Sequence, residues 1–273
     1  MIKSISKDAS RYIAGELKAI ENDNQVRILL AVESGSRAWG FPSSDSDYDV
    51  RFLYVRQPDW YLSICKRRDV IELPLDPVWD INGWDLQKAL QLLIKPNPVL
   101  LEWLSSPIVY QSDLEFVARI TDLAREMSFH TSSRFHYLHL ASTQYRRYVE
   151  NQEVVRMKKY FYVLRPALAL MWLRENPGIP VPMNFQALME GLPLSNSVSS
   201  LLNDLIEKKR VTKELGTTGH LVEFDHLIEA ELAWAQNVRE ETQKSNRDFK
   251  NEADNIFYET VMKPEDWTEK LAV

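Results

Sequence analysis

The spacing of apolar residues changes along the first third of the chain, which predicts a mixture of helices and strands. Apolar side chains recur at helical spacing from about Ser4 to about Glu21, and Asn22-Asp23-Asn24 ends this helix. The continuously apolar run Val26–Val32 predicts a buried strand, and a second strand is expected at about Asp47–Val55. The elements that follow are shorter: a helix at 60–66, strands at 69–73 and 78–81, and helices at 85–93 and 99–104.

The later part of the chain has a helical pattern. From Asp113 onward, apolar residues recur at helical spacing and the opposite faces are charged. Helices are expected up to about residue 128 and then at 134–149, 154–175 and 221–247. The tail after Asn251, which contains Trp267, is expected to pack back onto the fold. We therefore expect an α+β fold, with a mixed sheet and flanking helices in a domain at 1–110 and a helical domain at 111–273.

Length and composition narrow the class of protein. A chain of 273 residues with 45% hydrophobic residues suits one large or two smaller globular domains. No apolar run reaches the roughly 20 residues of a membrane span, and the N-terminus lacks the apolar core of a signal peptide. The single cysteine, Cys65, fits a reducing cytoplasm. The net charge of −6 argues against a protein that coats nucleic acid broadly, although a local basic groove is compatible with it.

Candidate chemistry is concentrated between Glu33 and Val50. The turn Ser34-Gly35-Ser36 follows the first strand and offers backbone N–H groups and a hydroxyl to a phosphate. Asp47 and Asp49 are two residues apart, so their side chains point to the same face if this segment is extended. Two adjacent carboxylates repel each other unless a cation lies between them, and Mg²⁺ suits such a pair. These features predict a nucleotide-handling site.

The combination of Gly35-Ser36 with Asp47-x-Asp49 resembles the nucleotidyltransferases of the DNA polymerase β superfamily. Flanking residues make the chain similar to the RlaP-like family of predicted nucleotidyltransferases, which is associated with RNA repair. These flanking segments are SGSRAWG at 34–40, DSDYDVR at 45–51, Asn97-Pro98 and Glu102-Trp103-Leu104. The resemblance extends from about Val26 to about Leu188 and more loosely beyond.

The resemblance implies transfer of a nucleoside monophosphate from an NTP, with ATP favoured, to a hydroxyl acceptor with release of pyrophosphate. It implies two Mg²⁺ ions, with Mn²⁺ as an alternative, held by Asp47, Asp49 and a third carboxylate. Gly35 and Ser36 would hold the β- and γ-phosphates. An RNA end is the favoured acceptor, and a partner protein, a small molecule or a non-catalytic nucleotide sensor are the alternatives.

Three residues compete for the role of third carboxylate. Asp80 lies between Trp79 and Ile81, so on a strand its side chain faces away from both, as a carboxylate in a cleft would. Asp85 has the position of a helix N-cap, and Asp76 lies in a turn flanked by prolines. The strand position favours Asp80, which the resemblance also favours, and Asp85 is the main alternative.

Basic residues interleave with aromatic residues between Tyr145 and Arg165. In two-domain nucleotidyltransferases a helical domain often supplies a lysine and a tyrosine to the nucleotide, and the resemblance assigns this role to Lys159, Tyr160 and Arg165. Helical spacing alone does not separate Lys159 from Lys158. The alternative interpretation is a solvated basic face with Tyr160 and Phe161 in the core.

Other charged residues could belong to a site or have a purely structural role. Arg37 is expected either to neutralise a phosphate or to pair with Glu33, and Arg51 is interpreted as a structural ion-pair partner. The runs Lys66-Arg67-Arg68 and Lys208-Lys209-Arg210 are candidate contacts for a nucleic-acid backbone, although such runs are usually solvated. His136 and His139 have a spacing that can bind zinc, but no cysteine or further histidine lies nearby to complete the site.

Overall fold

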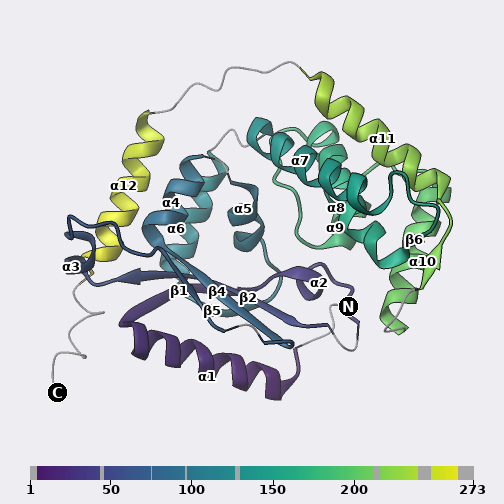
Figure 1. Ribbon diagram of the computed structural model, residues 1–273. Helices are drawn as coiled ribbons and strands as arrows, with labels where there is room; N and C mark the ends of the chain where they lie inside the picture. The colour runs from purple at the N-terminus through teal and green to yellow at the C-terminus, as the bar shows by residue number, and fades with distance from the viewer. Residues whose placement is uncertain are drawn as a thin grey trace. The chain divides into compact units, whose positions relative to one another are not determined.

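The computed structural model describes residues 5–43, 46–74, 76–95, 97–126, 130–211, 216–238 and 247–263. The chain forms two compact units. Residues 3–35, 47–127 and 244–273 make up the first, which we call the sheet unit. Residues 1–2, 36–46 and 128–243 make up the second, which we call the helical unit. The chain therefore passes from one unit to the other directly after Gly35 and returns directly before Asp47 (Figure 1).

The sheet unit contains a mixed five-stranded sheet in the order β3-β4-β2-β1-β5. Its strands are β1 (Val26–Glu33), β2 (Tyr48–Arg56), β3 (Val70–Glu72), β4 (Trp79–Asp85) and β5 (Val109–Ser112). The pair β2–β4 is parallel and the other pairs are antiparallel. The expected strands β1 and β2 are confirmed, whereas β4 is longer than expected because all seven of its residues pair with β2. The edge strand β5 was not expected because its four residues carry no periodic pattern.

Helices cover the sheet and build the rest of the fold. The sheet unit has α1 (Lys7–Asn24), α3 (Pro58–Tyr61), α4 (Leu86–Ile94), α5 (Pro98–Leu104), α6 (Leu114–Arg125) and α12 (Arg247–Val261). The short helix α2 (Gly35–Ala38) spans the passage between the units. The helical unit has α7 (His130–Tyr148), α8 (Met157–Glu175), α9 (Phe185–Glu190), α10 (Asn196–Val211), α11 (Val222–Asn237) and the two short strands β6 (Val155–Arg156) and β7 (Thr217–Thr218). The α+β fold is confirmed, and the domain division at residue 110 stays a prediction.

Some expected helix boundaries are wrong. The helix expected at 60–66 is α3, which begins earlier because Pro58 occupies its first turn and which ends at Tyr61. The single helix expected at 221–247 is two, since α11 ends at Asn237 and α12 begins at Arg247. In agreement with the expected packing of the tail, α12 lies against α4 and α6. Trp267 lies outside the described residues.

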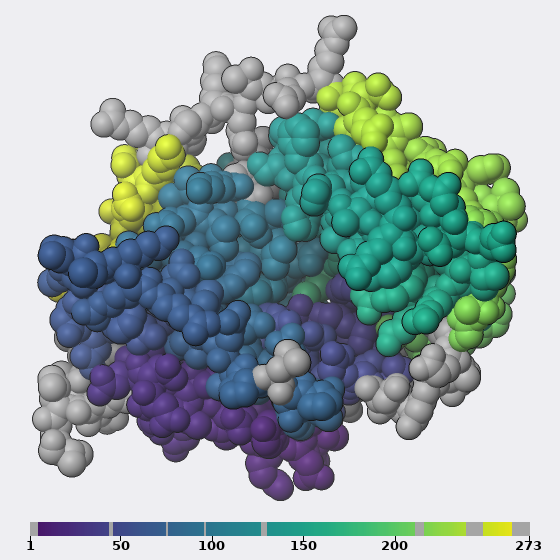
Figure 2. All heavy atoms as spheres, viewed as in Figure 1, coloured from purple at the N-terminus to yellow at the C-terminus, as the bar shows by residue number. Residues whose placement is uncertain are grey.

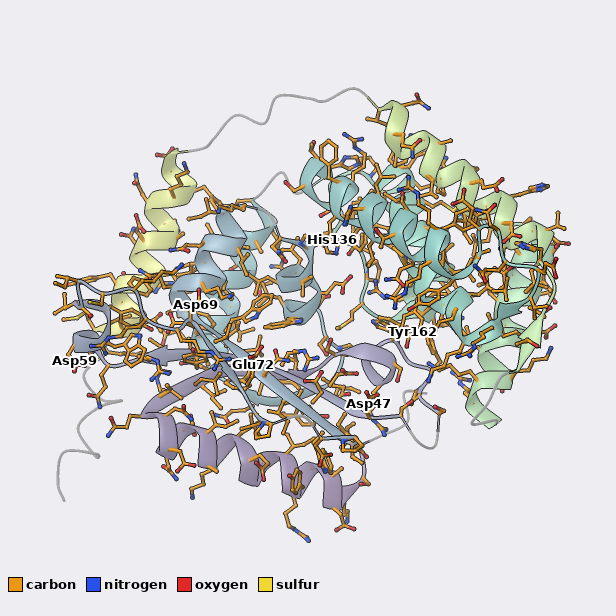
Figure 3. All side chains as sticks on the ribbon, viewed as in Figure 1. Asp47, Asp59, Asp69, Glu72, His136 and Tyr162 are labelled. Carbon is orange, nitrogen blue, oxygen red and sulfur yellow. The ribbon has the colours of Figure 1, made fainter. Side chains whose placement is uncertain are left out.

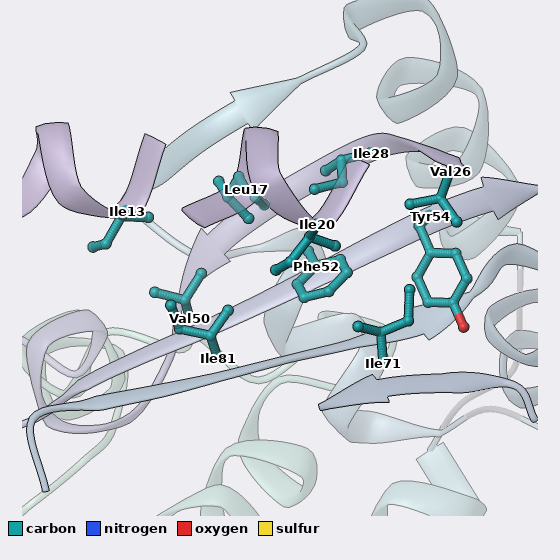
Figure 4. Packing of buried hydrophobic residues seen from close by; sticks show 11 residues of the cluster. Ile13, Leu17, Ile20, Val26, Ile28, Val50, Phe52, Tyr54, Ile71 and Ile81 are labelled. Atoms are coloured by element: carbon teal, nitrogen blue, oxygen red, sulfur yellow. The ribbon is translucent and has the colours of Figure 1, made fainter. Parts of the chain in front are cut away.

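The alternation of side chains on the strands divides the sheet into two faces. On one face Val50, Phe52 and Tyr54 of β2 pack against Ile13 and Leu17 of α1 (Figure 4). Further core residues on this face are Ile20, Val26, Ile28, Ala31, Ile71 and Ile81. Because alternate residues of a strand point to opposite faces, Asp49 and Arg51 of β2 point away from this core. None of the described helices is both long and apolar enough to cross a membrane.

The close packing of β4 on β2 makes Gly83 a sensitive position. A Cβ added to Gly83 would lie 2.3 Å from the ring of the fully buried Phe52. We expect Gly83→Ala to lower the free energy of unfolding by about 1–3 kcal/mol, since an overpacked core must shift its side chains. Gly15 lies at an exposed position of α1 with nothing within 4 Å of an added Cβ. Gly15→Ala should therefore raise the free energy of unfolding by about 0.5–1 kcal/mol. Urea unfolding followed by circular dichroism measures both, and an unchanged midpoint for Gly83→Ala would contradict this packing.

Candidate active site

Two of the expected carboxylates lie side by side on the face of the sheet opposite α1. Asp49 of β2 and Asp80 of β4 are direct partners in the parallel register. Their strand neighbours Val50 and Ile81 belong to the core on the α1 face, so both aspartates project from the other face. The expectation that Asp80 faces away from its apolar neighbours agrees with this arrangement.

A guanidinium group joins the two aspartates. Arg51 Nη2 lies 2.6 Å from Asp80 Oδ2 and 3.3 Å from Asp49 Oδ1. Arg51 Nη1 also donates to the backbone oxygen of Asp80 at 2.8 Å. The Arg51 side chain is 15% exposed, and the interpretation of Arg51 as a structural ion-pair partner is confirmed. Positive charge is therefore held where the two carboxylates meet, which offsets their repulsion.

Asp49 is also fixed through its backbone. Its N–H donates to Glu33 Oε1 at 3.0 Å, and its carbonyl accepts from the Ser34 N–H at 2.8 Å. Glu33 is completely buried and accepts a second hydrogen bond from the Tyr110 hydroxyl. This supporting role of Glu33 was not predicted, and its only sequence signal is an acidic residue at the end of an apolar strand, directly before the turn.

The turn after β1 lies directly against Asp49. Gly35 has a φ of +58°, and a Cβ there would come within 2.0 Å of Asp49 Oδ2. Only glycine therefore fits this position, because any side chain would both strain the backbone and displace the carboxylate. As expected, the Gly-Ser turn lies close to a carboxylate, since Gly35 is next to Asp49 in the sheet unit.

Asp47 lies one residue before β2 and is exposed (Figure 3). Within the described ranges, no group of three or more His, Cys, Asp or Glu side chains is arranged to hold a metal ion. The structure thus brings Asp49 and Asp80 together but does not add Asp47 to them. Among the described residues, His136 and His139 are not part of such a group either.

The other two candidates for the third carboxylate have structural roles. Asp85 caps α4 by accepting from the Gln87 N–H at 2.8 Å, as its position predicted, and it accepts from the Tyr61 hydroxyl at 3.0 Å. Asp76 accepts from the backbone N–H groups of Val78 and Trp79 in an exposed turn. Asp80 is the candidate that pairs in register with Asp49, and its role as third carboxylate stays a prediction.

Ser36 and Arg37 belong to a compact loop in the helical unit. The Ser36 hydroxyl donates to Ser46 Oγ at 3.1 Å, and Arg37 Nη2 donates to the Ser46 carbonyl. The Ser43 N–H also donates to Ser46 Oγ, at 3.0 Å. These bonds join Ser36, Arg37 and Ser43 to Ser46. The roles expected for Ser36 and Arg37 toward a phosphate stay predictions.

The same loop is anchored in the helical core by its aromatic residues. Phe41 is buried, with its ring 4.6 Å from that of Phe161 of α8. Lys209 of α10 is also buried, and its Nζ lies 4.4 Å from the centre of the Phe41 ring. The backbone N–H of Phe185 donates to the Trp39 carbonyl at 2.9 Å. Lys209 is therefore not part of a solvated basic run, because its ammonium group lies over aromatic rings.

The three residues assigned to the nucleotide on α8 have different environments. Lys159 Nζ lies 4.3 Å and 4.8 Å from the ring centres of Tyr148 and Tyr162. Arg165 is buried, with its guanidinium 5.0 Å from the centre of the Trp39 ring. Tyr162 is exposed (Figure 3). Lys158 is exposed, so the choice between Lys158 and Lys159 stays open.

Tyr160 lies in the core of the helical unit. It is completely buried, its hydroxyl donates to Asp225 Oδ1 at 3.1 Å, and it accepts from the Leu221 N–H at 3.0 Å. Burial raises the pKa of the Tyr160 hydroxyl to about 12. These contacts favour the interpretation of Tyr160 as a core residue over direct contact with a nucleotide.

Comparison with known proteins finds a family and two similar proteins. The family described as "RlaP: RNA repair pathway DNA polymerase beta family" matches residues 9–259. The uncharacterized protein YcgL of Bacillus subtilis (strain 168) is 43% identical over 249 residues, which cover 91% of this chain and 95% of that protein. A crystal structure of a nucleotidyltransferase-like protein from Exiguobacterium sibiricum 255-15 aligns with a TM-score of 0.28 at 12% identity, covering 91% of this chain and 79% of that one.

The buried cap Asp85 should make stability depend on pH. Burial raises the pKa of its carboxyl to about 6, so the folded protein keeps a proton that the unfolded chain has already lost. The free energy of unfolding should therefore fall as the pH rises from about 4 to about 6. Asp85→Asn retains an oxygen for the cap and removes this contribution.

Urea unfolding at several pH values between about 4.5 and about 7 tests this expectation. The stability of the parent relative to Asp85→Asn should decrease up to about pH 6, the raised pKa of Asp85, and level off above it. Asp76→Asn, in the exposed turn, serves as the control substitution. A constant difference between the parent and Asp85→Asn would show that Asp85 does not titrate there.

Proposed function

Since the chain belongs to the RlaP family, a DNA polymerase β-type nucleotidyltransferase family linked to RNA repair, we propose that it transfers a nucleoside monophosphate from an NTP to a hydroxyl acceptor. Pyrophosphate is the second product. The observation that carries the proposal is the pairing of Asp49 with Asp80 beside the turn at Gly35. We favour an RNA end as the acceptor because the family is linked to RNA repair, and ATP as the donor.

The residues around Asp49 suit a divalent cation. Their donor atoms are carboxylate oxygens, which Mg²⁺ and Mn²⁺ prefer, and the structure already holds one cationic group between them. Asp49 and Asp80 would hold two Mg²⁺ ions together with the exposed Asp47. Bound Mg²⁺ would supply charge neutralisation at the phosphates and lower the pKa of the attacking hydroxyl.

The protein's own groups have separate tasks in this proposal. Asp80, whose side chain is 45% exposed, is accessible to an acceptor hydroxyl and would take its proton. Asp49, 20% exposed and fixed by Glu33 and Ser34, would keep its carboxylate in one position. Arg51 would keep the two carboxylates in place through its ion pairs.

Residues toward the phosphates and the nucleotide complete the proposal. The backbone of Gly35 and the hydroxyl of Ser36 would contact the β- and γ-phosphates, with Arg37 as a further cation. From the helical unit, Lys159 and Arg165 would contact the nucleotide. We assign Tyr160 to holding α8 against α11, through its hydrogen bond to Asp225.

Transfer of label tests this function directly. The protein is incubated with Mg²⁺ and each α-³²P-labelled NTP, together with total RNA and lysate protein. We expect label in RNA, and a loss of at least about 10²-fold in rate for Asp49→Asn and for Asp80→Asn, since each removes a charge that the transition state needs. Asp76→Asn should react like the parent.

Two results would change the proposal. Transfer by Asp49→Asn at the parental rate would contradict a role for the aspartate pair. Label in a discrete protein band, absent in Asp49→Asn, would retain the reaction but change the acceptor from RNA to protein.

Gly35 offers a test with a matched control. Gly35→Ala and Gly178→Ala both place a side chain at positive φ, but only the first would collide with Asp49, because nothing lies within 4 Å of Gly178. Both should lose about 1 kcal/mol of stability through backbone strain. Only Gly35→Ala should also lose about 10²-fold in transfer rate, by displacing the carboxylate. Equal transfer rates for the two variants would show that Gly35 has no role in the reaction.

A further inference from the structure

A cavity of about 370 Å³ lies in the sheet unit, away from the paired aspartates. The residues of its wall that matter here are Trp60, Lys66, Arg67, Arg68, Asp69 and Lys88. They come from α3, from the loop that follows it and from α4. This part of the chain (blue in Figure 2) lies on the surface in that view. The proposed reaction gives this cavity no role.

Four cations line the cavity against two acids. Lys66, Arg67 and Arg68 come from the loop, and Lys88 comes from α4. Arg68 Nη2 lies 2.5 Å from Glu72 Oε2 and Lys88 Nζ lies 3.2 Å from Asp69 Oδ1, so these two cations are paired. The cations of the wall nevertheless outnumber its two acids, Asp69 and Asp85. The cavity therefore has a net positive charge from two separate elements.

The wall also combines an aromatic ring with arginine groups. The guanidinium carbon of Arg67 lies 4.4 Å from the ring centre of Trp60, and that of Arg56, which is not part of the wall, lies 3.8 Å from it. Ile64, another residue of the wall, is fully exposed. Proteins that bind single-stranded nucleic acid use this combination, since cations contact the phosphates and aromatic or guanidinium planes stack on the bases.

The position of the cavity relative to the aspartates follows from strand β4. Asp69 accepts a hydrogen bond from the N–H of Asp85 at the end of β4, whereas Asp80 lies near its beginning. Five residues of a strand span about 17 Å. Figure 3 likewise shows Asp69 and Asp47 toward opposite ends of this part of the sheet. A short stretch of single-stranded RNA is long enough to bridge such a distance.

We propose that this cavity binds single-stranded RNA a few nucleotides away from the end that is modified. Lys66, Arg67 and Lys88 contact backbone phosphates, and Trp60 with Arg67 provides a stacking surface for a base. This assignment rests on the proposed function, for which it supplies the binding site of the acceptor. An acidic peptide would use the cations but not the stacking surface.

Fluorescence anisotropy with a labelled single-stranded RNA dodecamer, without NTP, tests the proposal at several salt concentrations. We expect Lys66→Ala/Arg67→Ala to bind about 10-fold more weakly and to reduce the slope of log K against log salt by about 1.4, which corresponds to two lost phosphate contacts. Trp60→Leu should weaken binding by at least about 5-fold without changing the slope. Circular dichroism verifies the folding of each variant.

A matched pair of substitutions controls for net charge. Arg11→Ala/Lys18→Ala also removes two exposed cations, but from α1, and should bind RNA like the parent. Equal weakening by both pairs would reduce the effect to overall charge and overturn the proposal, as would unchanged binding by Lys66→Ala/Arg67→Ala. Polyglutamate that competes as effectively as unlabelled RNA would also overturn the proposal, because the cavity would then bind any polyanion.

The design separates failure of this site from failure of the proposed reaction. RNA binding is measured without NTP, so the binding of the cavity variants does not depend on the transfer of label. If the parent labels RNA but the cavity variants bind and react normally, only the cavity assignment fails. If the parent labels nothing while the cavity variants lose RNA binding, the cavity assignment stands and the reaction fails.

Discussion

The ion pairing of Arg51 with Asp49 and Asp80 is the interaction on which the candidate site depends. Parallel pairing of β2 with β4 places the two carboxylates directly opposite each other, where they would repel without a cation. The guanidinium supplies that charge from the same face of β2. Holding these charges together costs free energy, which burial of apolar side chains on the opposite face offsets. There Val50, Phe52 and Ile81 pack the same strand segments against α1.

A second constraint acts through the turn that follows β1. Gly35 lies so close to Asp49 that no side chain fits, and the residues directly after it enter a loop anchored by Phe41 in the helical unit. A single peptide bond therefore joins Gly35, which lies against the Asp49 carboxylate, to the loop whose Phe41 ring lies beside Lys209. Residues 36–46 belong to the helical unit, and the chain then returns to the sheet unit to form β2.

Local signals in the sequence were sufficient for much of the fold. Long periodic segments predicted α1 and α8, the apolar run predicted β1, and the capping position of Asp85 was recognised correctly. The features that were missed depend on contacts between distant residues. The burial of Glu33 requires Tyr110 of an edge strand, and the burial of Lys209 requires two phenylalanine rings from other segments. For Tyr160 the sequence left both a nucleotide contact and a core position open, and its contacts with Asp225 and Leu221 favour the core.

We propose that Asp49 and Asp80 hold the catalytic cations beside a nucleotide. Crystals of the protein with Mn²⁺ and a non-hydrolysable ATP analogue, measured at a wavelength where manganese scatters anomalously, test it most directly. We expect an anomalous peak between the carboxylates of Asp49 and Asp80 and the phosphates of the analogue. Ordered nucleotide with its manganese bound at other residues, or a nucleotide bound away from Gly35, would contradict it.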